Sequence, residues 1–281
     1  MDVITLKKYH GLGNDYLVLD PNKNEIQLHE RNIAMLCRRN FGVGADGILY
    51  GPILEDEKIK MQIFNADGSQ AEQGGNGVRI FAKYLMDEGY VTEKKFCLTT
   101  LAGEVEIEFL AEDGTTMRVN MGKPSYASSV IPMIGEDKEI INEPLRFGGN
   151  FYNTTCLSIG NPNCVIMMEE VSAKAATVLG PYVENASYFP NRINMQLLKV
   201  IDRGNIQIEI YDRGEGYTLA SGTGACAAAA AANRMGLVDE HVTVHMPGGE
   251  LLIELEQDQT IYMTGTVGTV GTFTLAENFF A

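Results

Sequence analysis

Two short Gly-rich segments hold the residue types whose spacing could do chemistry. Gly75-Asn76-Gly77 and Gly222-Thr223-Gly224 each come just before a segment with helical patterning. Glycines at such a place let the backbone approach a ligand closely, and the first free N–H groups of a helix favour negative charge. Ordinary capping by Asn76 or Thr223 would explain one such segment. Two copies favour a shared binding site for a small carboxylate.

A carboxylate held between two helix N-termini has a chemical consequence. Removing the α-proton of an amino acid moves charge onto its carboxylate, and the two termini would stabilise that charge without a metal or a pyridoxal cofactor. Two similar halves around the ligand would also offer one acid–base group to each face of the α-carbon. This is the arrangement that a two-base racemase needs.

The chain repeats itself with an offset of 147 residues. The offset places Ile63-Phe64-Asn65 on Ile210-Tyr211-Asp212, and Gly13-Asn14 on Gly160-Asn161. It also brings the two Gly-rich segments into register. A run of matches in one register indicates two copies of one structural unit rather than two unrelated loops.

Each copy predicts one main helix after its Gly-rich segment. The helices are expected at 78–88 and 225–235, and the second is rich in alanine, a strong helix former. Gly89 and Gly236 follow them directly, where a C-terminal glycine cap belongs.

Short strands are predicted on both sides of each helix. Many short strands around one main helix per half are typical of α+β folds. We therefore expect two pseudo-symmetric α+β domains, each a strand-rich sheet around a central helix, with a ligand cleft between them. Regular patterning fades between Pro124 and Asn150, so the domains are expected at 1–130 and 131–281, with closing strands free to cross over. Alternating apolar and polar residues mark the strands at 59–63, 105–109, 206–210 and 252–255.

The bulk composition excludes several classes of function. The chain has 281 residues and a formal net charge of −15, so it lacks the basic face that nucleic acid or an anionic membrane needs. Five scattered cysteines include no CxxC pair, so no structural zinc site is expected, and reduced thiols in a cytoplasm fit best. The N-terminus shows no signal segment, and no stretch approaches the ~20 apolar residues of a membrane span. We expect a cytoplasmic protein without metal, nucleic-acid or membrane partners.

A set of sequence blocks lies in one order along residues 10–225. The blocks are His10-Gly11-Leu12-Gly13-Asn14-Asp15, Gly42-Val43-Gly44-Ala45-Asp46-Gly47, Phe64-Asn65-Ala66-Asp67-Gly68-Ser69 with Gly75-Asn76-Gly77-Val78-Arg79, Gly160-Asn161-Pro162, Phe189-Pro190-Asn191-Arg192-Ile193-Asn194, and Arg213-Gly214 with Gly222-Thr223-Gly224-Ala225. Together they are highly specific, and the chain resembles the diaminopimelate epimerases. The resemblance implies an amino-acid racemase or epimerase of lysine and cell-wall biosynthesis that needs no cofactor and takes a small amino acid as its substrate. A homodimer is compatible with strand-rich domains, which often pair.

The resemblance also implies which residues hold the substrate. An arginine suits the distal carboxylate, because its guanidinium can donate two parallel hydrogen bonds to a carboxylate. The residues that would bind this distal carboxylate are Asn65, Asn161, Asn194 and Arg213. The residues that would hold the reacting end are Asn14, Gly75, Asn76, Gly222 and Thr223.

The four positions at which the family handles protons hold other residues here. The resemblance places a cysteine at Gly74 and at Ser221, a histidine at Asn163 and a glutamate at Asp212. A thiol has a reference pKa of ~8.5, and a helix N-terminus lowers it further. A serine hydroxyl is a far weaker acid than a thiol, so it needs a partner base to take its proton. Glycine and asparagine take no proton. The two-thiol mechanism is therefore not possible with this sequence, and Asp212 is the surviving acid–base group.

Two cysteines lie close to these positions in the sequence. Cys226 falls about one turn inside the second helix, and Cys164 follows Asn163 in a predicted strand. Burial in the core is the favoured interpretation for both. The four histidines offer no obvious base.

Three hypotheses follow for the function. The first is an isomerase that binds diaminopimelate or a similar amino acid, with Asp212 as acid–base group and Ser221 relaying a proton. The second is a non-catalytic sensor or regulator, because the binding residues are kept while the proton-handling residues differ. The third is an inactivated epimerase variant, which suits a serine at Ser221 but not a glycine at Gly74. We favour the enzyme.

Overall fold

The chain divides into two compact units. The computed structural model describes residues 4–26, 28–56, 58–71 and 75–280. Unit 1 consists of Met1–Val119 and Gly265–Ala281, and unit 2 consists of Asn120–Thr264. The last residues of the chain thus belong to the same unit as the first. The expected boundary between residues 130 and 131 stays a prediction.

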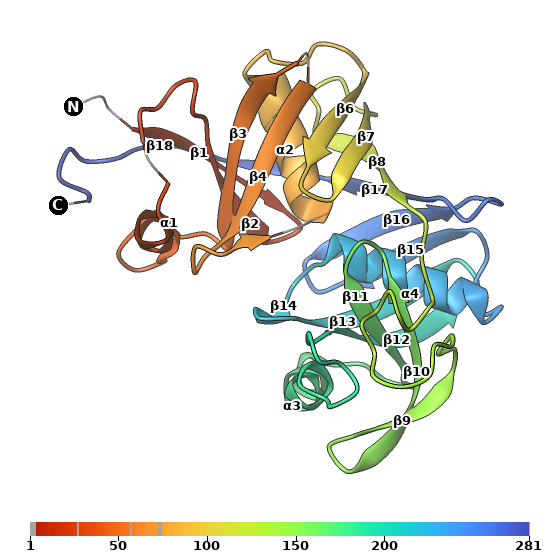
Figure 1. Ribbon diagram of the computed structural model, residues 1–281. Coiled ribbons are helices and arrows are strands. Elements are labelled where there is room, and N and C mark those ends of the chain that lie inside the picture. The colour runs from red at the N-terminus through yellow and green to blue at the C-terminus, as the bar shows by residue number, and fades with distance from the viewer. Residues whose placement is uncertain (1–3, 27, 57, 72–74, 281) are drawn as a thin grey trace. The chain divides into compact units, whose positions relative to one another are not determined.

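Unit 1 surrounds one long helix with short strands (Figure 1). Its elements are β1 (Thr5–Gly11), β2 (Asn14–Leu19), α1 (Glu30–Cys37), β3 (Gly47–Glu55), β4 (Lys58–Asn65), β5 (Gln70–Ala71), α2 (Gly75–Asp87), β6 (Lys95–Thr100), β7 (Gly103–Phe109), β8 (Thr116–Gly122) and β18 (Gly268–Thr274). Parallel and antiparallel pairs alternate from β2 to β3, β4, β6 and β7. Strand β18 from the end of the chain pairs with β1.

Unit 2 repeats the order of elements from β1 to β8, with one additional strand before it. Its elements are β9 (Glu143–Phe147), β10 (Asn150–Ser158), β11 (Pro162–Met167), α3 (Ala173–Glu184), β12 (Asn194–Asp202), β13 (Asn205–Asp212), β14 (Gly216–Thr218), α4 (Gly222–Arg234), β15 (His241–Met246), β16 (Gly249–Leu255) and β17 (Ile261–Thr266). The alternation of parallel and antiparallel pairs recurs from β11 to β12, β13, β15 and β16. The predicted internal repeat is therefore confirmed in the pairing of the strands.

The two main helices have matching bounds. Helices α2 and α4 are 13 residues long, and their first residues, Gly75 and Gly222, are separated by the offset of the repeat. Both begin earlier than predicted, because the Gly-rich segments form the first helical turn instead of a preceding loop. Both end one residue earlier than predicted, and the expected glycines Gly89 and Gly236 follow with φ values of 72° and 73°.

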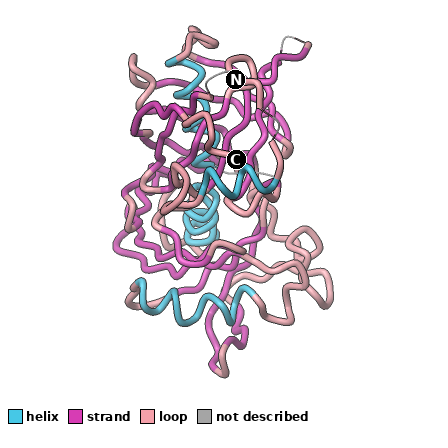
Figure 2. The backbone as a smooth tube through the Cα atoms, turned by 90° about the vertical axis from the view of Figure 1, so that its left-hand side faces the viewer, coloured by secondary structure: helices cyan, strands magenta, loops and turns pink. Residues whose placement is uncertain are grey.

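The main helix of each unit is buried among strands. In unit 2, α4 contacts β10, β11, β12, β13, β15 and β16, and its residues from Gly222 to Ala232 are buried. The small alanine side chains let these strands approach the helix closely. Strands account for most of the regular structure (Figure 2), which confirms the α+β prediction. None of the described helices combines the length and apolar character that crossing a bilayer requires.

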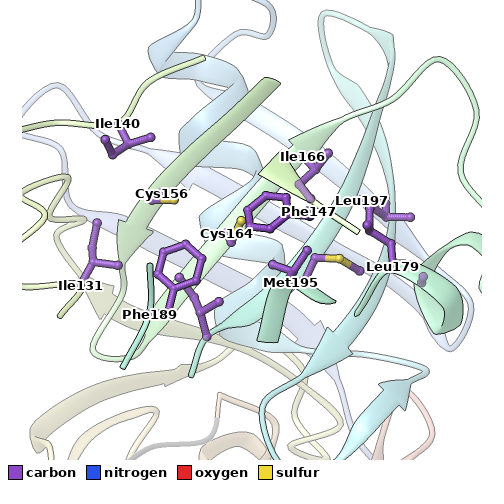
Figure 3. Close-up of a cluster of buried hydrophobic side chains, with 13 residues drawn as sticks. Ile131, Ile140, Phe147, Cys156, Cys164, Ile166, Leu179, Phe189, Met195 and Leu197 are labelled. Carbon is purple, nitrogen blue, oxygen red and sulfur yellow. The ribbon is translucent and has the colours of Figure 1, made fainter. Parts of the chain in front are cut away.

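A buried apolar cluster in unit 2 fixes the strands that carry polar residues at their starts. Phe147, Cys164, Leu179 and Met195 belong to this cluster, which joins α3 to β10, β11 and β12 (Figure 3). Strands β11 and β12 run parallel, so their early residues lie side by side. The register pairs Asn163 with Asn194, and two expected site residues thus become neighbours.

Candidate active site

Ser221 caps the helix that the second Gly-rich segment begins. Its Oγ accepts a hydrogen bond from the Gly224 N–H at 3.2 Å, and its backbone is extended, as is usual for an N-cap. The amides of the first turn have no acceptors within the helix, and the helix dipole adds positive potential there. This end of α4 can therefore hold an anion.

Asp212 lies at the end of β13, beside this cap. Its Oδ2 accepts a hydrogen bond from Thr218 Oγ1 at 3.0 Å, and the Ser221 hydroxyl also hydrogen-bonds the carboxyl. Burial raises the pKa of Asp212 to about 6, although both hydrogen bonds act in the opposite direction. A carboxyl group with this pKa exchanges protons close to neutral pH, which suits an acid–base catalyst.

Asn161 joins the Gly-Asn-Pro segment to the first turn of α4. Its Nδ2 donates to Thr223 Oγ1 at 3.1 Å. Asn163, where the resemblance places a histidine, donates through Nδ2 to the Asn161 backbone oxygen at 2.8 Å and to its Oδ1 at 3.0 Å. Asn163 is fully buried, so it orients its neighbour and carries no proton for exchange.

Asn194 ties together the ends of three strands. Its Nδ2 donates to the Pro162 oxygen at 3.0 Å, and its Oδ1 accepts from the Arg213 N–H at 2.9 Å. The Arg213 guanidinium donates to the Asn191 oxygen at 3.1 Å through Nη1. Unit 2 thus brings eight expected site residues together, namely Asn161, Asn163, Asn194, Asp212, Arg213, Ser221, Gly222 and Thr223.

Glu184 is a site residue that the sequence reasoning missed. Its Oε1 accepts from the Gly214 N–H at 2.8 Å and from Arg192 Nη1 at 3.1 Å, so it fixes the turn after Arg213. The residue ends α3 and is largely buried. A carboxylate near a helix C-terminus is unfavourable for the helix dipole, but the sequence analysis predicted no helix here and so gave no signal for Glu184.

The first Gly-rich segment of unit 1 makes a matching contact. Asn76 Nδ2 donates to Asn14 Oδ1 at 3.1 Å across 62 residues, the same separation that joins Asn161 to Thr223. The fully buried Arg79 donates to Asn76 Oδ1 at 2.8 Å. The internal repeat therefore extends to a hydrogen bond between loop and helix in each unit.

A charged cluster holds Asn14 from the other side. Asn14 Nδ2 donates to Asp46 Oδ2 at 2.9 Å, and Arg39 binds Asp46 at 2.6 Å and Asp15 at 2.8 Å. Burial favours the neutral form of Asp15, but hydrogen bonds from Arg39 and Lys8 lower its pKa to about 2. The Asp15 carboxylate therefore stays ionised at neutral pH and does not exchange protons there, while Asp46 positions Asn14.

The remaining expected residues of unit 1 are less connected. Asn65 ends β4, and its Nδ2 donates to Ser69 Oγ at 3.0 Å. Gly75 begins α2. Gly74, at a cysteine position of the family, lies outside the described residues. The expectation that the helix termini of both units address one ligand stays a prediction.

The two nearby cysteines do not replace the missing thiols. Cys226 and Cys164 are fully buried, as the sequence analysis favoured. Burial raises the pKa of Cys164 well above its usual value, and contact with the Cys156 thiol acts in the same direction. Both sulfurs of that pair lie in the apolar cluster (Figure 3), and the Cys164 thiol stays protonated at neutral pH.

Comparisons with known proteins agree with this arrangement. The family description "Diaminopimelate epimerase" matches residues 6–127 and 155–270. The chain belongs to the diaminopimelate epimerase family. It is 46% identical over 275 residues to diaminopimelate epimerase 2 of Nostoc sp., covering 98% of this chain and 96% of the relative. It is 38% identical over 262 residues to the diaminopimelate epimerase of Moorella thermoacetica, covering 92% of this chain and 94% of the relative.

A solved structure shares the fold of this family member. A probable proline racemase from Agrobacterium radiobacter matches with a TM-score of 0.70 at 15% identity, covering 98% of this chain and 93% of that chain. Membership of the diaminopimelate epimerase family confirms the expected isomerase class, and the alternative of a non-catalytic binder is not favoured. The part that each residue plays in the chemistry is the subject of a proposal.

Proposed function

We propose that this chain isomerises diaminopimelate or a similar amino acid, with Asp212 as the group that takes and returns the α-proton. The carboxyl group of Asp212, with a pKa raised to about 6 beside the N-terminus of α4, is the observation that carries the proposal. The relatives named as diaminopimelate epimerases support the choice of substrate. This substrate would place the reaction in lysine and cell-wall biosynthesis, and we propose a cytoplasmic location with it.

The reaction breaks and re-forms one C–H bond. In the proposed step, the Asp212 carboxylate takes the α-proton, and the electron pair of that bond moves into the carboxylate of the substrate. The first-turn amides of α4 at Gly222 and Thr223 stabilise the added charge, so no pyridoxal group is required. To give the other isomer, a water molecule donates a proton to the opposite face of the α-carbon, and Asp212 releases the proton that it took to the resulting hydroxide.

Ser221 links the base to the helix. Its hydroxyl bonds the Asp212 carboxyl while its Oγ accepts from the Gly224 N–H. One hydroxyl can serve both contacts, because it has one proton and two lone pairs. We assign Ser221 to hold the carboxylate toward the α-carbon and to pass a proton to it.

The distal carboxylate would bind Arg213. Asn194 and Asn191 fix the backbone and one nitrogen of this arginine, which leaves its other N–H groups for a carboxylate. Asn65 and Asn161 are assigned to the same end of the substrate by resemblance, and Asn14, Gly75 and Asn76 to the reacting end. A homodimer stays a prediction.

The proposal is tested by proton exchange in heavy water. The protein is incubated with LL- or meso-diaminopimelate in D₂O, and the α-proton signals are followed by NMR. Loss of these signals together with interconversion of the isomers is expected. Exchange without interconversion would restrict the chemistry to one face of the α-carbon. Binding without any exchange would refute Asp212 as a working base.

A further inference from the structure

Gln196 is a buried amide that no expected site residue explains. It lies on β12, its side chain is fully buried, and its Nε2 donates to Asn163 Oδ1 at 3.0 Å. Its Oε1 has no hydrogen-bond partner in the part of the chain that the structure describes. An unpaired buried oxygen costs stability, so an apolar residue would suit the core better if packing were the only purpose.

The helix makes room for this side chain. A Cβ atom at Gly224 would lie 2.9 Å from Gln196 Nε2, which is too close for two unbonded heavy atoms. Gly224 is the last residue of the second Gly-rich segment. The glycine therefore admits the Gln196 amide to the first turn of α4.

A line of hydrogen bonds leads from Gln196 to Thr223. Asn163 Nδ2 donates to Asn161 at 2.8 and 3.0 Å, and Asn161 Nδ2 donates to Thr223 Oγ1 at 3.1 Å. The side-chain oxygens of Asn163 and Asn161 each receive a hydrogen bond, and all three amides donate through nitrogen toward Thr223. We call these four residues, Gln196, Asn163, Asn161 and Thr223, the amide relay.

The direction of the amide relay is fixed by its middle. The backbone oxygen of Asn161 can only accept, so Asn163 must turn its NH₂ group toward it. The Asn163 oxygen then faces Gln196, which must donate. A reversed Asn163 would bring its oxygen against both Asn161 oxygens and its nitrogen against the Gln196 nitrogen.

The end of the amide relay is a hydroxyl that donates outward. Because Thr223 Oγ1 accepts from Asn161, its own proton is directed to another acceptor, and aligned hydrogen bonds polarise one another. We propose that Gln196 and Asn163 are positioning residues, which hold the Thr223 hydroxyl as a donor to the reacting carboxylate of the ligand. The identity of that ligand rests on the proposed function, whereas the relay itself does not.

A positioning role for Gln196 can be told from ordinary packing by comparing the unfolding free energy with the exchange rate. The change Gln196→Met removes one unpaired oxygen and leaves another on Asn163, so the free energy of unfolding should change little. The rate should change, because the charge on the reacting carboxylate grows as the α-proton leaves and a misdirected donor stabilises it less.

The experiment compares Gln196→Met, Thr223→Val and the double variant, with Met195→Leu as a control in the adjacent strand position. The side-chain amide signals of Asn161 are recorded by NMR in the free protein. The exchange rate is measured in D₂O with saturating meso-diaminopimelate. We expect both single changes to move the Asn161 signals, and Gln196→Met to slow exchange about tenfold, the effect of one hydrogen bond to a charged group. In the double variant, Gln196→Met should slow exchange by less than about a further twofold compared with Thr223→Val alone.

The outcomes are distinct. Unmoved Asn161 signals, or full multiplication of the two rate effects, would overturn the amide relay. If both variants move the Asn161 signals but the wild-type protein catalyses no exchange, the result would support the amide relay and refute the proposed function. Thr223→Val keeps the shape of the side chain, so it tests the last link even if Gln196→Met does not fold. Met195→Leu is expected to leave both readouts unchanged.

Discussion

At the scale of single residues, Asp212 is where burial and hydrogen bonding oppose each other. Burial raises its pKa to about 6, while Thr218 and Ser221 favour the ionised form. The sequence identified Asp212 as the surviving acid–base group through its place before Arg213. It could not predict the raised pKa, because burial depends on strands and loops that only the fold brings around the carboxyl.

The exchange rate should follow the ionisation of Asp212. The carboxylate is the base, so the rate in heavy water is expected to rise as pH increases through about 6 and to level off above pH 7. Asp212→Asn should lower the plateau by at least about 100-fold. A pH–rate profile measured with saturating diaminopimelate checks both, and a wild-type profile that is flat from pH 5 to 8 would contradict the assignment.

The same group should make stability depend on pH. Its folded-state pKa, about 6, lies above its ordinary value of 3.8, so the stability that its neutral form contributes is lost as pH rises through about 6. Asp212→Asn removes this loss, and its Tm relative to wild type should therefore increase between pH 4.5 and 7.5. Asp258→Asn is the control, because hydrogen bonds from Lys123 and Thr260 lower the pKa of Asp258 to about 2. The same change in relative Tm for both variants would contradict the raised pKa of Asp212.

At the scale of elements, the two main helices were the part of the fold that the sequence predicted best. Their number, period and glycine ends could be predicted from periodicity and from Gly89 and Gly236. Their starts could not, because glycine is a poor helix former and the Gly-rich segments were interpreted as loops. Gln196 was missed because it belongs to none of the sequence blocks, and its apolar neighbours gave no sign of a site.

The role of Ser221 as the N-cap of α4 can be measured separately from its effect on Asp212. Ser221→Ala removes the hydrogen bond to the Gly224 N–H and should cost about 1 kcal/mol of unfolding free energy in urea. It also removes a hydrogen bond that lowers the pKa of Asp212, so the midpoint of the pH–rate profile should move upward. Ser172→Ala is a matched control, because Ser172 caps α3 through an equal 3.2 Å bond from the Ala175 N–H. Ser172→Ala should cost a similar unfolding free energy and leave the midpoint of the pH–rate profile unchanged. A midpoint shifted by Ser172→Ala would weaken the assignment of the shift to the Ser221–Asp212 hydrogen bond.

At the scale of the whole molecule, the internal repeat explains the fold and also hides a difference. The units share the order of parallel and antiparallel strand pairs, yet the hydrogen bond that Asn14 accepts from Asn76 runs in the opposite sense from the one that Asn161 donates to Thr223. The offset of the repeat was visible in the sequence. The sense of these hydrogen bonds was not, because it depends on Arg79 in one unit and on Asn163 in the other.

Removal of the last strand should affect one unit more than the other. Deleting residues 268–281 takes away β18, which pairs with β1 from Thr5 to His10. Hydrogen exchange followed by mass spectrometry should show lost protection in residues 5–10 and retained protection in β12 and β13. Equal loss of protection in both units would show that unit 2 does not fold independently of β18.

The return of the chain end to unit 1 sets the order in which the protein is built on the ribosome. Residues of unit 1 emerge first and β1 can pair with β2, but its second partner, β18, is translated after all of unit 2. At ~10 residues per second, this delay is on the order of ten seconds. During that time β1 presents an open strand edge, to which other chains can pair. Unit 2 is therefore complete before unit 1, and one edge of β1 stays open until β18 is made.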